Sequence, residues 1–215
     1  HNRVRRQRQM CIRDRFLYGS AGMRRQGMLG RAYDAVYSAQ GSNIVVKDIS
    51  SNTQVFCSGQ SSEISCLAVS PDGTLLASGQ ENMAGVKAPI IVWDLDAIVA
   101  NWGSGDRTNE RRAELLLHMG KVQDLSFSHD STYLSSVGGQ DDNALVVWEA
   151  ATGTAICGSP AATDSTKRVS WYNGRSDRLV TAGNYHLRVW TFDLPNRKLR
   201  PVDVIWGKLQ RIVTA

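Results

Sequence analysis

The sequence predicts an all-β fold made of repeated four-stranded sheets, and two observations support it. An apolar run that ends in Trp stands at residues 90–93, 145–148 and 187–190, and a weaker form without the Trp stands at 44–47. The spacing from Lys47 to Trp93 is 46 residues, from Trp93 to Trp148 it is 55, and from Trp148 to Trp190 it is 42. A period near 40 to 45 residues with a Trp-acid pair closing each unit is typical of a four-stranded propeller blade.

Each unit also offers two earlier strands joined by a turn. In the second unit, residues 63–70 alternate in hydropathy, the turn at 71–73 uses the fixed φ of Pro71 and the permissive Gly73, and residues 74–80 form the next strand. The third unit repeats this order at 121–128, 129–131 and 132–139, and the fourth at 167–172, 173–177 and 178–184. The sequence therefore predicts an incomplete β-propeller of about three full blades plus part of others.

A single four-stranded sheet cannot bury its own faces, so each blade must stack on its neighbours. The apolar third strands suit burial on both faces, and we expect each Trp to fill the space between two blades. Two insertions lengthen the period, at residues 81–89 before the third strand and at 97–112 after it. We expect both to project from the rim or a face, where binding proteins differ from their relatives.

We divide the chain into a disordered or extraneous basic tail (1–15), a lead-in (16–33) and a partial propeller (34–215). Residues 209–215 are similar to the first strand of a further blade. Propellers use about four to eight blades, so we interpret the chain as a piece of a longer protein with two open sheet edges.

The net charge of +5 argues against nucleic-acid binding once its position is considered. Residues 1–15 hold six Arg and one Asp, so the remaining 200 residues balance at 19 basic and 19 acidic side chains. Clustered basic residues mark phosphate-binding surfaces, and here they belong to the tail alone. The sequence has no run of 18 apolar residues, so we expect neither nucleic acid nor membrane as a partner.

The sequence predicts no catalytic centre, cofactor or metal site. His118, Asp124 and Ser126 could compose a nucleophilic triad on paper, but no nucleophile turn accompanies them. The acidic turn at 138–143 lacks the spacing of a calcium loop. The four cysteines form no C-x-x-C pair and have no His at zinc-ligand spacing, so we interpret them as reduced thiols in an intracellular protein.

Two further features favour an ordinary structural reading over a binding site. The basic segment 193–201 is interpreted as a solvated loop, with a dedicated anion patch as the alternative. Trp102 and Trp206 lie outside the repeat position and are interpreted as packed side chains, with partner anchors as the alternative.

The units resemble the WD-repeat family, whose blades carry a hydrogen-bonded set of His, Ser or Thr, Trp and Asp. The third unit matches it fully with His118, Ser136, Asp142 and Trp148. The second unit has Ser78 and Trp93 but Gln60 in place of His, and the fourth has Thr181 and Trp190 but Asn184 in place of Asp. The resemblance implies that these residues have a structural role.

More specific sequence motifs resemble the cilia- and flagella-associated protein 52 family, above all "AICGSPAA" from Ala155 and "FDLPNRK" from Phe192. The resemblance runs from about Asp34 to Val213. It implies a non-enzymatic scaffold inside the doublet microtubules of the ciliary or flagellar axoneme, which binds tubulin and neighbouring axonemal proteins. The insertion 97–112 departs from the shorter connection expected in that family, and it puts in doubt any contact assigned to this rim.

Two alternatives remain. The echinoderm microtubule-associated-protein-like family has a similar "ASGQ" strand before a long hairpin loop, and it would place tubulin binding on cytoplasmic microtubules. The chain has "AICGSPAA", for which that family has no equivalent. A WD-repeat adaptor of a ubiquitin-ligase or signalling complex would recruit substrates through a charged pocket on one face.

Overall fold

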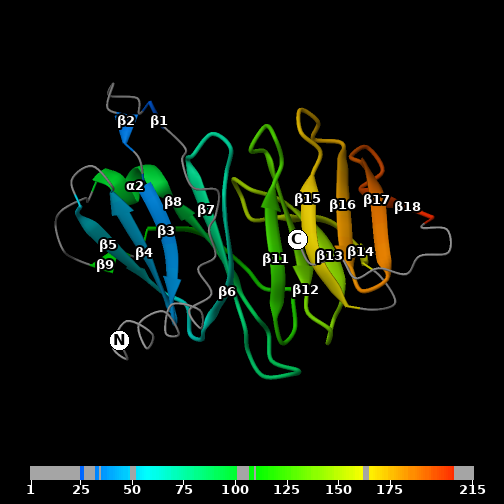
Figure 1. Cartoon of the computed structure of the whole chain (residues 1–215), viewed down its shortest axis with the longest axis horizontal. Helices are drawn as coiled ribbons and strands as arrows, with labels where there is room; N and C mark the ends of the chain where they lie inside the picture. Colours follow the sequence, from blue (N-terminus) through cyan, green and yellow to red (C-terminus); the bar gives the residue numbers. More distant parts are fainter. Residues whose placement is uncertain are drawn as a thin grey trace, which may run out of the picture.

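The fold is seen in a computed structural model that describes residues 25–26, 32–33, 35–48, 52–100, 107–108, 110–161 and 165–205. The proposed tail (1–15), Trp102, Trp206 and residues 209–215 lie outside this part of the chain. Four four-stranded sheets stand side by side in chain order (Figure 1). A two-stranded ladder of β1 (Arg25–Gln26) and β2 (Ala32–Tyr33) precedes them. The predicted all-β architecture of repeated sheets is confirmed.

Three sheets are antiparallel and follow the order of the chain. The second sheet holds β6 (Ile64–Val69), β7 (Leu75–Gln80), β8 (Ile90–Asp94) and β10 (Arg111–Leu115). The third sheet holds β11 (Val122–Phe127), β12 (Tyr133–Gly138), β13 (Ala144–Glu149) and β14 (Ala155–Pro160). The fourth sheet holds β15 (Thr166–Trp171), β16 (Arg178–Gly183), β17 (His186–Asp193) and β18 (Lys198–Asp203).

The first sheet is built differently. It contains β3 (Ala35–Gln40), β4 (Asn43–Asp48) and β5 (Gln54–Ser58) in antiparallel order, and these correspond to the later strands of a blade. Its fourth strand, β9 (Arg107–Thr108), comes from the connection that follows β8 and pairs in parallel with β5. The first two sheets are therefore joined by main-chain hydrogen bonds as well as by packing.

The turns between first and second strands repeat one hydrogen-bond pattern. In the second sheet the Ser70 hydroxyl donates to Asp72 and accepts from the Leu75 amide, at 2.6 and 2.9 Å. In the third sheet Ser128 makes the same bonds with Asp130 and the Tyr133 amide, at 2.6 and 2.9 Å. Such side-chain to backbone bonds satisfy turn groups that the strands leave unpaired. Equal turns set the same register in both hairpins.

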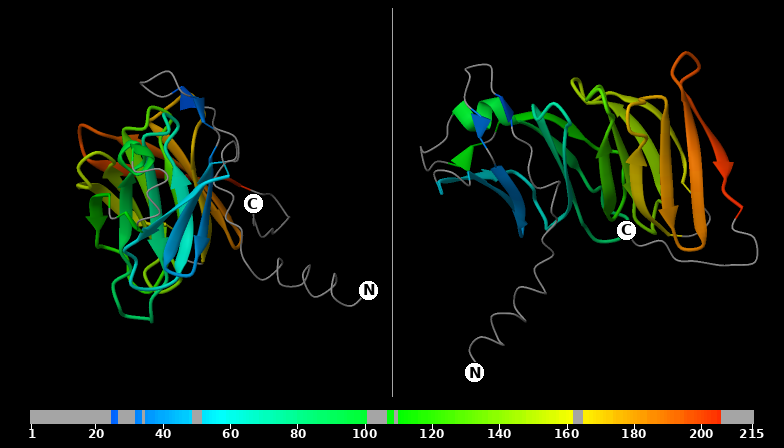
Figure 2. Two further views of the ribbon diagram at one scale, coloured as in Figure 1. Left: turned by 90° about the vertical axis from the view of Figure 1, so that its left-hand side faces the viewer. Right: turned by 45° about the horizontal axis from the view of Figure 1, so that its top comes forward.

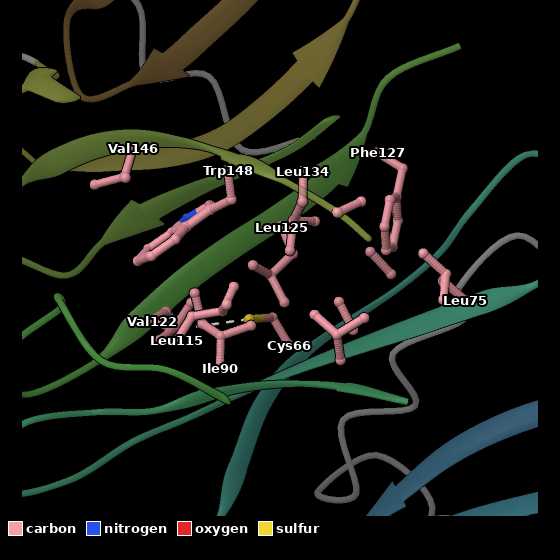
Figure 3. Packing of buried hydrophobic residues seen from close by; sticks show 14 of the residues in the cluster. Cys66, Leu75, Ile90, Leu115, Val122, Leu125, Phe127, Leu134, Val146 and Trp148 are labelled. Carbon is pink, nitrogen blue, oxygen red and sulfur yellow. Dashed lines mark hydrogen bonds between the residues drawn. The ribbon is translucent and has the colours of Figure 1, made fainter. Parts of the chain in front are cut away.

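The core consists of three apolar clusters, each shared by two successive sheets. Trp93 belongs to the cluster between the first and second sheets, Trp148 to the next and Trp190 to the last. Figure 3 shows Trp148 and Leu134 on one side of such a cluster, with Ile90 and Cys66 on the other. The third strands of the second and third sheets are buried on both faces, since Ile90 to Trp93 and Leu145 to Trp148 are all at most 5% exposed. The expected position of each Trp between two blades is confirmed.

The expectation for the insertion 97–112 was only partly right. Its start forms a short helix, α2 (Leu95–Ala100), that the sequence did not predict. Asp94 Oδ1 accepts from the Asp96 and Ala97 amides, which otherwise lack partners at a helix start. Leu95 and Ile98 are fully buried in the cluster between the first and second sheets. With β9 paired to β5, the two described parts of this segment, α2 and β9, contact the sheets instead of projecting from them.

Candidate functional site

The third sheet brings the four predicted residues His118, Ser136, Asp142 and Trp148 together. His118 Nδ1 lies 2.9 Å from Asp142 Oδ2, and His118 Nε2 lies 2.7 Å from Ser136 Oγ. The Trp148 indole donates to the same Ser136 oxygen at 2.7 Å. With its proton on Nδ1, the imidazole donates to Asp142 and accepts from the Ser136 hydroxyl, so every group of the set has a partner.

Asp142 connects this set to the turn that precedes the first strand. Its Oδ2 also accepts from the Met119 amide at 2.9 Å, and its Oδ1 accepts from the Ala144 amide at 3.1 Å. Burial acts to raise the pKa of Asp142, but the hydrogen bonds from His118 and the two amides outweigh burial and hold the pKa below its ordinary value. The carboxylate is thus stabilised in its charged form.

The order Ser136–His118–Asp142 is the order of a nucleophilic triad, but it is not placed for catalysis. Ser136 is fully buried, and its oxygen already accepts from the Trp148 indole. A nucleophile has to reach a substrate carbon, and this oxygen faces the interior. The second possible triad, His118 with Asp124 and Ser126, is not formed. Asp124 contacts Arg168 and Val169 instead of His118. The arrangement supports a structural role.

The second sheet carries a variant of the set. The Trp93 indole donates to Ser78 Oγ at 2.8 Å, and Gln60 Nε2 donates to the same oxygen at 2.7 Å and to the Ser78 carbonyl at 3.0 Å. Among the described residues, Gln60 Oε1 is the single buried side-chain oxygen or nitrogen without a hydrogen-bond partner. Gln60 therefore replaces the imidazole as a partner of Ser78, but leaves one acceptor unused.

The fourth sheet keeps only the pair of Thr181 and Trp190, whose indole donates to Thr181 Oγ1 at 2.9 Å. The hairpin between β16 and β17 consists of Asn184 and Tyr185, with Tyr185 at φ +57°, and it is shorter than the turn that holds Asp142. The substitution of Asp by Asn184 thus accompanies a change in the length of the turn. Residues 162–164, which precede β15, lie outside the described chain.

Hydrogen bonds also join the first strands of successive sheets. Asp124 Oδ2 on β11 accepts from the Val169 amide on β15 at 2.9 Å, and the Trp171 indole donates to the Ser126 carbonyl at 3.1 Å. One sheet earlier, the Ser65 hydroxyl donates to the Val122 carbonyl at 2.6 Å. Burial raises the pKa of Asp124, although the Val169 amide and Arg168 favour its charged form. No local pattern in the sequence could predict these bonds, because they join residues far apart in the chain.

A group of exposed apolar side chains lies at one end of the second sheet. The insertion 81–89 pairs with the segment before β11 through the Lys87–Met119 and Glu81–Lys121 bridges. The Gly120 amide donates to the Val86 carbonyl at 2.8 Å. This pairing defines a rim surface whose exposed apolar members are Met83, Val86, Leu117 and Met119. Exposed apolar side chains grouped in this way are typical of protein contact sites.

The basic segment 193–201 forms the turn between β17 and β18 and the strand after it. Arg200 Nη2 lies 2.7 Å from Asp193 Oδ2, and Asn196 also donates to this carboxylate. Arg188 on β17 pairs with Asp203 on β18 and donates to the Ala161 carbonyl at 2.9 Å. Arg200 and the neighbouring Arg188 therefore form ion pairs with carboxylates of the same sheet.

The following statements apply to the described residues, which lie between 25 and 205 with gaps. It holds no group of three or more His, Cys, Asp or Glu side chains placed to share a metal ion. None of its helices has the length and hydropathy to cross a membrane. Cys57, Cys66 and Cys157 are free thiols, and burial raises the pKa of the first two to about 12 and of the third to about 11.

Comparison with known proteins agrees with the repeat architecture. Residues 48–84 and 110–149 match the family described as WD domain, G-beta repeat. Among solved structures, the chain is similar to U3-55K, with 22% identity and a TM-score of 0.59 over 78% of this chain and 47% of the other. The RRP9 WD40 repeats give the same values. At this identity the similarity shows the fold alone.

Curated relatives are closer in sequence. The chain is 46% identical to cilia- and flagella-associated protein 52 of Chlamydomonas reinhardtii and 41% identical to the human protein of that name, each over 80% of this chain. It is 26% identical to centriole proteome protein 16 of Chlamydomonas reinhardtii over 69% of this chain and 8% of the relative. The chain spans 26% and 27% of the length of the first two relatives. Residues 48–84 and 110–149 are therefore WD repeats, and over 80% of its length the chain is a homologue of the proteins named cilia- and flagella-associated protein 52.

Proposed function

We propose that this chain is part of a non-enzymatic scaffold of the cilium or flagellum, bound to the axonemal doublet microtubules and to their neighbouring proteins. The observation that carries the proposal is the 46% identity to a relative named for cilia and flagella. Tubulin and other axonemal proteins are the proposed partners, and the microtubule lumen is the proposed location. Neither nucleic acid nor membrane is a proposed partner.

The geometry supports a scaffold in preference to an enzyme. The His, Ser and Asp side chains that could do chemistry are used inside the third sheet, where Ser136 and His118 are at most 1% exposed. We assign the same structural role to the Ser or Thr and Trp pairs of the other sheets, which are Ser78 with Trp93 and Thr181 with Trp190. Rigid sheets that share their cores suit a protein that presents loops to partners.

We further propose that residues 34–215 are one propeller region and that residues 1–15 take no part in it. The rim surface of Met83, Val86, Leu117 and Met119 is the proposed contact, because these four exposed apolar side chains belong to two paired segments and Met83 is 82% exposed. Flexible Met side chains adapt to the shape of a partner. Burial of such a surface contributes affinity that depends little on salt.

Co-assembly of the purified protein with tubulin tests the proposed partner. Tubulin is polymerised in the presence of the chain, since a protein bound in the lumen has to enter during assembly. We expect the chain to pellet with the polymer, and the double variant Met83→Glu and Val86→Glu to reduce the bound fraction. Leu194→Glu is the control, because Leu194 is also exposed but lies in the turn before β18. No pelleting above the level of an unrelated protein would contradict tubulin as a partner.

A further inference from the structure

The second and third sheets have equivalent positions at the end where their second strands finish. Strand pairing places Gln80 opposite Ile64 on the second sheet and Gly138 opposite Val122 on the third. Gln80 therefore occupies the position that Gly138 occupies one sheet later. The two sheets share a core cluster and lie next to each other in the row of sheets in the right-hand view of Figure 2. Their hydrogen-bonded sets can thus be compared residue by residue.

On the third sheet, a carboxylate fills the space beside this position. A Cβ on Gly138 would overlap the Asp142 carboxylate. That carboxylate binds His118 and the Met119 amide, as described above. Asp142 stands six residues before Trp148, in the turn between the second and third strands. Glycine at 138 therefore leaves room for an acidic side chain that comes from the turn.

The insertion 81–89 changes the corresponding turn of the second sheet. The residue six positions before Trp93 is Lys87 instead of Asp, and its side chain is exposed. Gln80, at the position of the glycine, is fully buried. The second sheet thus lacks the carboxylate of the third and has a neutral amide side chain beside the place where it would lie.

Gln80 makes one of the backbone contacts that the carboxylate makes on the third sheet. Its Oε1 accepts from the Ser61 amide at 3.2 Å. Ser61 corresponds to Met119, because each stands three residues before the start of the first strand of its sheet. Gln80 therefore binds on the second sheet the amide equivalent to the one that Asp142 binds on the third.

The other end of the Gln80 amide holds the insertion. Gln80 Nε2 donates to Asn82 Oδ1 at 3.1 Å, and Asn82 Nδ2 donates to the Lys87 carbonyl at 2.7 Å. Asn82 and Lys87 lie on the two arms of the insertion, with Met83 and Val86 of the rim surface between them. The two amide side chains thus connect the buried end of β7 to both arms.

Hydrogen bonds, more than apolar burial, determine where the insertion lies. Residues 83–87 are all exposed, so they have no core of their own. The second arm is paired with the segment before β11, through the Val86 carbonyl with the Gly120 amide and the Ala88 amide with the His118 carbonyl. The link through Asn82 fixes the two arms to each other. A segment with few buried contacts opens easily when such bonds are lost.

We infer that Gln80 is a positioning residue of the rim surface: it takes over a contact of the missing Asp and fixes the insertion through Asn82. The insertion that carries Met83 and Val86 displaces the acidic turn, and the buried amide closes the end of the sheet in its place. The anchoring of the insertion is independent of the proposed function. Only its consequence for partner binding rests on that function.

Hydrogen exchange of the insertion tests the anchoring, in the full-length protein that contains this chain. Gln80→Met keeps the size of the side chain but removes its hydrogen bonds. We expect the amides of residues 82–88 to exchange at least about fivefold faster, as measured by peptide mass spectrometry. An unchanged exchange rate in this variant would overturn the anchoring.

Ser70→Ala is the matched control for a general loss of stability. Ser70 is also fully buried on the second sheet, and its hydroxyl bonds to Asp72 and Leu75 lie at the opposite end of the β6–β7 hairpin. Its loss should lower the free energy of unfolding but leave the exchange of residues 82–88 unchanged. An equal increase of exchange in Ser70→Ala and Gln80→Met would overturn a specific role of Gln80.

Asn82→Asp tests the link between the two arms. An Asp at this position keeps an acceptor for Gln80 Nε2 but has no donor for the Lys87 carbonyl. We expect residues 82–88 to exchange faster in this variant too, by at least about fivefold. Exchange at the wild-type rate would overturn the part assigned to Asn82.

Co-assembly with tubulin tests the consequence for the contact. A loosened insertion has to be ordered again on binding, so Gln80→Met should lower the bound fraction at least about twofold, while Ser70→Ala should bind like the wild-type protein. Faster exchange with unchanged binding would overturn the link between the anchor and the contact. Absence of binding by the wild-type protein would contradict tubulin as a partner, while the exchange rates still decide the anchoring.

Discussion

Asp124 on β11 and Val169 on β15 are joined by a 2.9 Å hydrogen bond that crosses from the third sheet to the fourth. A carboxylate here accepts from a backbone amide of the next sheet, so the two sheets are held together by a directed bond as well as by apolar contact. The bond lies on the first strands, while the indole–hydroxyl pairs lie on the second and third strands. The Asp124–Val169 bond therefore joins two sheets, whereas each indole–hydroxyl pair joins two strands of the same sheet.

Asp124→Asn tests the electrostatic part of this contact. Burial raises the pKa of Asp124, so the folded chain holds its proton more tightly than the unfolded chain. The stability contributed by this group is present below the ordinary Asp pKa, near about 4, and is lost as pH rises through the folded value. Asn keeps an acceptor for the Val169 amide but does not titrate. We therefore expect the decrease in the free energy of unfolding with rising pH to be smaller in Asp124→Asn than in the wild-type chain, as measured by urea unfolding at a series of pH values. The same pH dependence in both chains would contradict a raised pKa of Asp124.

Asp142→Asn should have the opposite effect on the pH profile. The hydrogen bonds from His118 and the Met119 and Ala144 amides overcome the effect of burial and lower the pKa of Asp142 in the folded chain. Stability from this group is therefore present above the ordinary Asp pKa and is lost as pH falls through the folded value. The wild-type chain should lose more stability on acidification below about pH 4 than Asp142→Asn does. Equal acid sensitivity of the two chains would show that this carboxylate is not stabilised as described.

Ser136→Ala tests the hydrogen-bonded set of the third sheet. The change leaves the Trp148 indole and the His118 ring without a shared partner in a buried site, so we expect a loss of about 3 kcal/mol in the free energy of unfolding. Ser135→Ala is the matched control, because Ser135 is equally buried but its hydroxyl donates only to the Ser126 carbonyl, at 3.0 Å. Its expected loss is about 1 kcal/mol. Equal losses in urea unfolding would mean that Ser136 has no special role.

Ile98→Ala tests the packing of α2 onto the first two sheets. Ile98 is fully buried in their shared cluster, and removal of such a side chain costs about 2 to 5 kcal/mol, depending on how far the site relaxes. Val99→Ala, on the same helix at a half-buried position, should cost about 1 kcal/mol or less. Thermal and urea unfolding of both variants measure the difference. If the two variants were equally stable, the segment after β8 would not be packed as described.

Much of the fold could be predicted from the sequence because the repeats are local signals. The strands around Trp93, Trp148 and Trp190, and the turns at Asp72 and Asp130, follow from hydropathy and turn residues within about ten positions. The pairing of β9 with β5 could not be predicted, because two residues carry no pattern and their partner lies in another unit. The Gln60 contact to Ser78 was also missed, since the sequence shows only that the expected His is absent.

The candidate site was predicted in part for the same reason. The sequence singled out Ser136 and Trp148 through their fixed places in a repeat, and the structure brings them together at 2.7 Å. It gave no indication that Met83 and Val86 would meet the segment around Met119, because that surface depends on a pairing between an insertion and a connection. Surfaces formed by loops of different units become visible only once the sheets are stacked.

Location in the cilium tests the central claim most directly. The full-length protein that contains this chain is tagged in a ciliated cell, cilia are isolated, and the axonemes are washed with detergent and then with salt. The account predicts that the tagged protein stays with the axonemal doublet microtubules after both washes. A protein found in the cytoplasm and absent from cilia, or released completely by detergent alone, would contradict a scaffold of the axoneme.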